Sequence, residues 1–217
     1  MVAEPQPQAT AGASGRAAPR GTLNVARWNE ILEAAGEVFH EKGYTAARIE
    51  DIAARVGILK GSLYYYIESK EDLLFAISDQ AHSTGVAALD EPPELADADA
   101  PTRLGEWVRR YGVVLEVNPP YASVAERDVG RLEGERYQLI MAKRNEMHRF
   151  VRSLVEQGIA EGAFDPTIDP GVASNTIFEM LNGTREWYHA DGRKSGDDIR
   201  EWYRTFILRG LAAPEPV

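Results

Sequence analysis

The segment IEDIAARVGILKGSLYYYIESKEDLL, from Ile49 to Leu74, decides the fold of this chain. Its first part has apolar residues at helical spacing and ends at Gly57, where a positive φ allows a sharp turn. Ala53 is small where two helices must approach closely, and Ile58 and Leu63 are suited to anchor the second helix to the first. Two short helices joined by a tight glycine-bearing turn have the geometry of a helix-turn-helix.

Three consecutive tyrosines, Tyr64, Tyr65 and Tyr66, close this segment's second helix. Three adjacent large rings cannot all face one core, so part of their surface is left for another partner. A helix in the major groove of DNA reads base edges with its N-terminal residues, and flanking groups contact phosphates. We interpret the tyrosines as part of such a DNA-binding surface. The alternative is that all three rings pack and only their hydroxyls reach the surface.

The remainder of the chain is also expected to be helical, because alternating β-branched runs are absent. Apolar spacing predicts helices at about residues 24–42, 46–56, 60–66, 69–88, 102–117, 121–129, 132–161, 171–189 and 197–211. Gly43 is expected to end the first helix and Ser69 to cap the fourth. The expected fold class is therefore all-α, with an N-terminal three-helix helix-turn-helix domain and a larger C-terminal helical domain.

Composition divides the chain into three parts. Residues 1–22 are rich in Pro, Gly, Ala, Ser and Gln, and are expected to form a disordered arm because they bury too little apolar surface to offset chain entropy. Residues 23–85 are expected to form the helix-turn-helix domain. Residues 101–213 are expected to form a larger helical domain, after the acidic linker LDEPPELADADAPT.

Charge and composition narrow the functional classes. The net charge is −10 with a pI near 5.0, which by itself argues against a nucleic-acid binder, although most of the acid lies outside residues 42–70, for example in the linker. The chain has no cysteine, so it holds no disulfide and no thiolate metal site, which suits a reducing cytoplasm. We expect a cytoplasmic protein without a membrane span, because no apolar run approaches about 18 residues.

Residues 31–74 resemble the helix-turn-helix domain of the TetR family of bacterial transcriptional regulators. The Gly-Tyr-Thr turn, the DIA…VG helix, the KGSLYYY recognition helix and the SKEDLL start of the next helix occur in the family's order and spacing. The resemblance implies that Thr45 caps the second helix and contacts phosphate, and that Lys70 approaches phosphate from the fourth. The DNA-binding residues it implies are Thr45, Arg48, Lys60, Gly61, Ser62, Tyr64, Tyr65, Tyr66 and Lys70.

Two residues depart from the family's pattern. Leu59 stands where a capping residue such as serine is often found, and a leucine side chain cannot cap a helix. We expect Leu59 to pack against apolar neighbours. Ile67 replaces the usual aromatic residue and is expected to fill the core in its place.

The resemblance also implies that the C-terminal helices form a dimer interface and a small-molecule pocket. The last two helices carry apolar stripes that would join those of a second copy in a four-helix bundle, or would simply be core of one chain. The expected interface residues are Ile177, Met180, Leu181, Thr184, Tyr188, Trp202, Tyr203 and Phe206. The expected ligand-binding residues are Trp107, Arg110, Tyr111, Tyr137, Met141, Arg144, Met147, His148, Phe178 and Trp187.

The segments VGILKGSLYYYIESKEDLL and KRNEMHRFVRSLVEQGIAEGAF are similar to TetR-type regulators of fatty-acid and steroid catabolism, several of which sense acyl-CoA thioesters. The resemblance implies a homodimer that binds a palindromic DNA operator and is released by a small-molecule inducer. We expect that inducer to be an acyl-CoA or a related lipid or steroid-derived acid, since Met and aromatic residues suit an apolar cavity and nearby arginines suit an anion. Repression is the family's usual mode, and activation stays open.

Two other classes of function compete with this one. Catalysis is disfavoured because the sequence has no Gly-rich phosphate loop, no metal-spaced His/Glu set and no nucleophile elbow, so no catalytic residue, metal or cofactor is expected. A helical scaffold or protein-interaction module, whose helix-turn-helix no longer binds DNA, remains an alternative. It is kept open by the charge of residues 24–85, which hold six basic and ten acidic residues.

Overall fold

The computed structural model describes residues 25–117, 119–189 and 191–214, and this part of the chain is helical without β-strands. In chain order its helices are α1 Val25–Lys42, α2 Ile49–Val56, α3 Lys60–Leu63, α4 Lys70–Ala87, α5 Ala100–Val117, α6 Pro119–Asp128, α7 Gly134–Ala160, α8 Pro170–Asn182, α9 Thr184–Trp187 and α10 Gly196–Leu211. Short 3-10 helices cover Pro93–Leu95 and Val129–Arg131. The all-α prediction is confirmed, while the expected arm, residues 1–22, lies outside the described residues.

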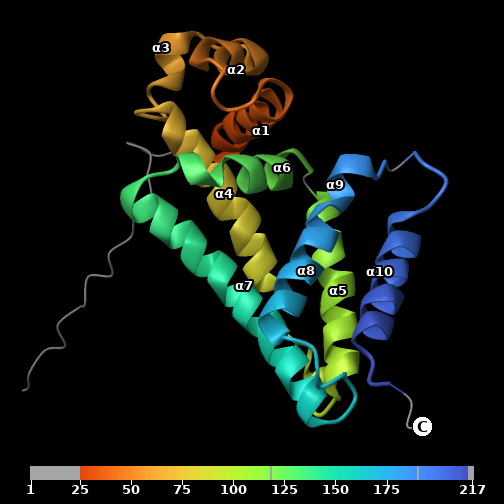
Figure 1. Ribbon diagram of the computed structural model, residues 1–217. Helices are drawn as coiled ribbons and strands as arrows, with labels where there is room; N and C mark the ends of the chain where they lie inside the picture. Colours follow the sequence, from red (N-terminus) through yellow and green to blue (C-terminus); the bar gives the residue numbers. More distant parts are fainter. Residues whose placement is uncertain (1–24, 118, 190, 215–217) are drawn as a thin grey trace, which may run out of the picture.

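The helices form two regions (Figure 1). Helices α1, α2 and α3 gather at one end of the molecule with the start of α4, and we call this region the head. Helix α4 runs from the head into the larger bundle, the body, and α7 extends along one side of it. Within the body α10 packs against α5, and α7 packs against α8, whereas α6 packs against both α1 and α4.

The helix-turn-helix forms from the residues that the sequence indicates. Gly43 and Gly57 have φ values of +77° and +75° at the ends of α1 and α2. The prediction that Thr45 caps α2 is wrong, because Thr45 lies in the preceding turn and Arg48 is the capping residue. The Arg48 amide donates a 2.9 Å hydrogen bond to the Asp51 carboxylate, which closes the first turn of α2.

Helix α3 is shorter than expected. It ends at Leu63, and Tyr64–Tyr66 continue as hydrogen-bonded turns instead of helix. Leu63 is fully buried and holds α3 on the head, as predicted, and Ile67 is also buried. The prediction that Leu59 packs is wrong: its side chain is 79% exposed at the start of α3.

The start of α4 follows the predicted cap. The Asp72 carboxylate accepts hydrogen bonds from the amides of Ser69 and Glu68 at 2.9 and 2.7 Å. Asp72 is buried and also pairs with Arg136 of α7, so one carboxylate fixes both the helix start and its contact with the body. Because Asp72 joins groups from two elements, it ties the head to α7.

The helix expected over residues 171–189 is interrupted. Helix α8 ends at Asn182, and α9 covers Thr184–Trp187 after Gly183. Apart from proline, glycine favours a helix less than the other residues do. The Thr184 hydroxyl also donates to the Tyr203 hydroxyl at 2.9 Å, which holds this part of the chain on α10.

Two hydrophobic cores follow from this packing. The first joins the head to α6 and to the start of α7, because Tyr121, Val124 and Ile140 are buried together with residues of α1 and α4. The second lies between α5, α7, α8 and α10. The limits expected for the domains, 23–85 and 101–213, stay a prediction. None of the described helices is both long and apolar enough to cross a membrane.

Candidate nucleic-acid interface and ligand pocket

The recognition surface is formed by Gly61, Ser62, Tyr64 and Tyr65, which are all exposed on α3 and the turn after it. Tyr64 and Tyr65 are 46% and 61% exposed, far more than a packed aromatic residue. Tyr66 differs, because it is half-buried against the first core, and its ring meets the Tyr65 ring edge-on at 5.5 Å. The structure therefore divides the run, with two rings outward and the third packed behind them.

Lys60, at the start of α3, is exposed but paired. Its ammonium donates to the Glu50 carboxylate at 2.6 Å and lies 5.8 Å from the centre of the Tyr64 ring. The hydrogen bond to Glu50 raises the pKa of Lys60, so Lys60 stays charged at neutral pH. Thr45 and Arg48 are exposed before α2, and the Arg48 guanidinium has no ion pair with another described residue.

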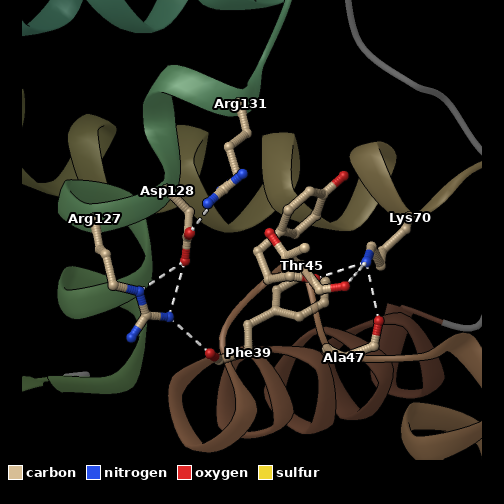
Figure 2. Close-up of polar contacts among 8 residues, drawn as sticks. Phe39, Thr45, Ala47, Lys70, Arg127, Asp128 and Arg131 are labelled. Carbon is tan, nitrogen blue, oxygen red and sulfur yellow. Dashed lines mark hydrogen bonds and ion pairs between the residues drawn. The ribbon is translucent and has the colours of Figure 1, made fainter.

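Lys70 points into the head (Figure 2). Its ammonium donates to the carbonyls of Tyr44 and Ala47 at 2.6 and 2.9 Å and lies 4.4 Å from the centre of the Tyr44 ring. Burial lowers the pKa of Lys70. The structure thus shows Lys70 holding the turn between α1 and α2, and we expect this role rather than the phosphate contact.

A cavity of about 150 Å³ lies in the body between α4, α5, α6, α7 and α8. Five of the predicted ligand-binding residues line it: Tyr111, Arg144, Met147, His148 and Phe178. The His148 and Phe178 rings lie 4.2 Å apart, and the Tyr111 hydroxyl donates to the Asn182 side chain at 3.1 Å. This cavity combines aromatic walls with a few polar groups, which is the usual character of a small-molecule site.

The charges in the cavity are already paired. Arg144 donates to the Glu126 carboxylate at 3.0 Å, so its charge is already balanced inside the cavity. Burial, and then the neighbouring Arg144, lower the pKa of His148. Burial also lowers the pKa of His82 of α4, whose Nδ1 donates to the Ser78 carbonyl at 2.7 Å. Near neutral pH the pocket is therefore lined by neutral hydrogen-bonding groups and one internal ion pair.

The other predicted ligand-binding residues do not line this cavity: Trp107, Arg110, Tyr137, Met141 and Trp187. Trp107 is fully buried behind the wall, where its ring stacks on Tyr111 at 5.1 Å. Arg110 instead donates to the Asp90 carbonyl, and Tyr137 packs on the first core. Trp187 is 52% exposed. Apolar spacing marks a helix face but does not say which stretch of that face meets a cavity.

Sequence reasoning missed the contribution of α4 and α6. Helix α4 supplies Gln80, Ala81, His82, Thr84 and Gly85, and α6 supplies Tyr121, Ala122, Ala125 and Glu126. Small residues on both helices leave the space that the cavity occupies. His82, a polar residue within an apolar helix face, was the available signal.

Helix α6 lines the pocket and also contacts the head, where Figure 2 shows its Arg127 bonded to the Phe39 carbonyl. Arg127 donates to the Phe39 carbonyl of α1 at 2.7 Å and to Asp128 at 2.8 Å. Asp128 is 3% exposed and also accepts from Arg131 at 3.1 Å. Because Glu126 lines the cavity next to Arg127, one turn of α6 connects the two regions.

The predicted dimer residues divide into two groups. Ile177, Leu181 and Tyr203 are buried in the chain's own second core, so the prediction that they face a partner is wrong. Trp202 and Phe206 of α10 are 57% and 51% exposed, and their rings stack at 4.9 Å. The half-buried members of the set are Met180, Thr184 and Tyr188.

Comparison with known families decides the identity. A model described as bacterial regulatory proteins of the tetR family matches residues 31–77, and a tetracyclin repressor-like C-terminal domain matches residues 97–211. The chain belongs to the TetR family. It is therefore a helix-turn-helix transcriptional regulator and not an enzyme.

Individual relatives agree with the TetR assignment. The chain is 25% identical over 189 residues to the transcriptional repressor KstR2 of Rhodococcus jostii, which covers 87% of this chain and 92% of KstR2. The structure of PfmR from Thermus thermophilus superposes with a TM-score of 0.74 at 30% identity, covering 83% of this chain and 98% of PfmR. The structure of AibR with isovaleryl coenzyme A and operator DNA shares the fold, with a TM-score of 0.71 at 24% identity over 87% of this chain and 99% of AibR.

Proposed function

We propose that this TetR-family regulator is a repressor that binds a palindromic operator as a homodimer and is released by a small molecule. The observation that carries the proposal is the exposed recognition surface of Gly61, Ser62, Tyr64 and Tyr65. Small residues at the start of a recognition helix allow its backbone to approach base edges. Tyrosine hydroxyls at its end are suited to contact phosphates, which fixes the helix in the groove.

A homodimer is supported by the stacked pair Trp202 and Phe206 on the surface of α10. Exposed apolar groups of this kind mark an interaction surface. In a twofold dimer the same patch meets itself, and two recognition helices then address half-sites about 34–36 Å apart. Trp187 and Val172, also exposed on α9 and α8, extend the proposed interface beyond the residues expected from the sequence.

An acyl-CoA is the ligand class that fits the cavity best. A volume of about 150 Å³ is below the roughly 300–1,000 Å³ of a site that encloses a whole ligand, so it suits the acyl group and leaves the nucleotide outside. The Glu126 carboxylate already balances the charge of Arg144, so an uncharged thioester carbonyl suits this lining better than a second carboxylate does. The AibR complex with isovaleryl coenzyme A provides a precedent for this class on the same fold.

Helix α6 supplies the route from ligand to head in this proposal. A ligand that enlarges the cavity pushes on Tyr121, Ala125 and Glu126, and the same helix holds the head through Arg127 and the Phe39 carbonyl. A changed position of α6 then changes the separation of the two recognition helices. For efficient release the ligand must prefer the non-binding arrangement by a few kcal/mol, roughly 5 for a complete switch.

The proposal is tested by selecting duplexes bound by the purified chain from a random library. We expect a palindromic sequence, with affinity lowered about tenfold or more by Tyr65→Ala. Tyr65→Phe keeps the ring and removes only the hydroxyl, so comparison with Tyr65→Ala separates the contribution of the hydroxyl from that of the ring. Acyl-CoA thioesters should weaken this binding and the corresponding free acids should not. Failure to enrich any duplex at low salt would favour the scaffold alternative.

A further inference from the structure

The Glu50–Lys60 pair lies at the edge of the recognition surface. Glu50 is the second residue of α2 and Lys60 the first of α3, so the pair connects the two helices of the helix-turn-helix. Its N–O distance is 2.6 Å, and the side chains are 56% and 49% exposed. Because Lys60 also lies near the Tyr64 ring, its ammonium belongs to the surface that DNA would approach.

Most other cations of the head are also engaged. Arg55 bonds to Glu37 and Glu41, Lys42 pairs with Asp51, and Lys70 is bonded to turn carbonyls. Of these contacts, only the one made by Lys60 involves a residue of α3. A head with more acids than bases therefore meets DNA with its recognition-helix cation neutralised by a neighbour.

An exposed pair of this kind contributes little to folding, so stability alone is a weak reason for it. The Glu50–Lys60 pair has a larger effect on the binding of DNA, which is a polyanion. While Lys60 is held by Glu50, it adds no counterion release on contact with phosphate, and the Glu50 carboxylate repels phosphate nearby. When base edges or a correctly placed phosphate compete for the ammonium, the solvated pair opens at small cost.

We propose that Glu50 is a specificity-determining residue that withholds Lys60 from non-cognate phosphates and releases it on a fitting half-site. This inference rests on the proposed DNA-binding function. Glu50 lowers affinity for any duplex, and contacts present only on the cognate site compensate for that loss. The ratio of specific to non-specific affinity rises as a result. This ratio determines how well the operator is occupied, because the genome offers a large excess of competing sites.

Glu50 also has a simpler role to be separated from this one. An acid in the first turn of a helix interacts favourably with the helix dipole. That role concerns the folding of α2 and leaves the preference between two duplexes unchanged. Binding to two duplexes, measured beside thermal unfolding, therefore distinguishes the roles.

The experiment compares Glu50→Gln with the wild type on two duplexes of about 30 base pairs, the selected operator and a scrambled sequence of equal composition. Affinity for the scrambled duplex at about 50 mM salt should rise about fivefold, and its log K versus log salt slope should steepen by about one unit, because Lys60 gains a phosphate contact. On a logarithmic scale, the affinity for the operator should change by less than half of the change seen for the scrambled duplex. The matched control is Glu30→Gln, which removes the same charge from an exposed pair with Arg27 on α1.

A double mutant localises the effect. In the Lys60→Gln background, Glu50→Gln should no longer steepen the slope. Equal gains for Glu50→Gln and Glu30→Gln, a gain that persists without Lys60, or a loss confined to the operator would each overturn the inference. None of these outcomes contradicts the proposed function. The proposed function is contradicted only if the wild-type protein selects no duplex.

Discussion

Lys60 and Lys70 belong to the same motif, yet the fold gives them opposite surroundings. Lys60 is exposed and paired with a carboxylate, whereas Lys70 donates to the carbonyls of Tyr44 and Ala47. Backbone carbonyls in a turn have no helical partner, so a lysine that satisfies them stabilises the turn. The effect of removing each lysine should therefore differ in kind.

Lys70→Met should destabilise the protein by about 1–3 kcal/mol, because carbonyls of the α1–α2 turn lose their donor. The free energy of unfolding from urea titration measures this. Lys60→Gln, at an exposed site, should stay within about 0.5 kcal/mol of the wild type. Folded Lys70→Met should have the wild-type slope of log K against log salt for DNA binding. A slope shallower by about one unit would instead show that Lys70 contacts phosphate.

His82 and His148 make stability depend on pH. Burial lowers the pKa of both, so between the folded and unfolded pKa values the unfolded chain binds more protons. Stability is then complete above about pH 6.5 and falls as the pH drops below it, by at most about 1.4 kcal/mol per unit for each histidine. Carboxylates with lowered pKa values titrate below this window.

Thermal unfolding between about pH 7.5 and 5.5 tests this behaviour. Melting temperature should fall toward acid, and His82→Asn should flatten the curve. The exposed His40 provides the control variant, His40→Asn, measured over the same pH range. A wild-type melting temperature that is constant or rises on acidification would contradict the assignment.

At the scale of single elements, α3 is too short to be stable alone. Four residues form one turn, and isolated helices of that length do not persist in water. Its position depends on buried Leu63 and Ile67 on one side and on the left-handed Gly57 that starts the turn. The position of α3 thus comes from its packing on the head and not from its own helix propensity.

Gly61→Ala should separate an effect on folding stability from an effect on DNA binding. A Cβ at Gly61 meets no atom of the described structure within 4 Å, so folding stability should be unchanged or rise by less than about 1 kcal/mol. If the helix lies in the groove, the added methyl should weaken operator binding about tenfold. Gly57→Ala, at φ +75°, should instead cost about 1–2 kcal/mol of stability. Unaltered operator binding by Gly61→Ala would argue against close approach.

At the scale of the whole molecule, α6 makes head and body one packed unit. Residues of α6 lie in the first core and also line the cavity, so the two regions share side chains of this helix. Interfaces packed in this way shift between discrete arrangements more readily than they deform continuously. Ligand sensing is proposed to use this property.

The dimer is the assembly-scale prediction. Trp202→Glu should give a monomer, because it places a charge in a desolvated apolar contact, and operator affinity should fall at least about a hundredfold. Sedimentation velocity and operator titration measure the two effects. Leu139→Glu, an exposed apolar position on α7, is the matched control and should stay dimeric. A dimeric Trp202→Glu protein would place the interface elsewhere.

Local sequence determined the helix-turn-helix by itself. Glycines with positive φ and a capping residue before α4 act within a few residues, so their spacing specifies where these helices start and end. The all-α class and most helix positions follow from apolar periodicity in the same way. That part of the tyrosine run is exposed followed from the observation that three adjacent rings cannot share one face, but which rings face outward did not.

Tertiary structure alone decided which apolar stripe faces the chain's own core and which faces outward. Ile177 and Tyr203 are buried while Trp202 is exposed, although all three lie on helices with similar apolar patterns. The cavity arises where small residues of α4 and α6 meet large ones of α5, α7 and α8, and no single helix records that meeting. The bonds of Lys70 to the turn carbonyls likewise depend on the packing of α4 beside the turn between α1 and α2. Periodicity specifies that a face is buried, but the partner of that face is chosen by packing over the whole chain.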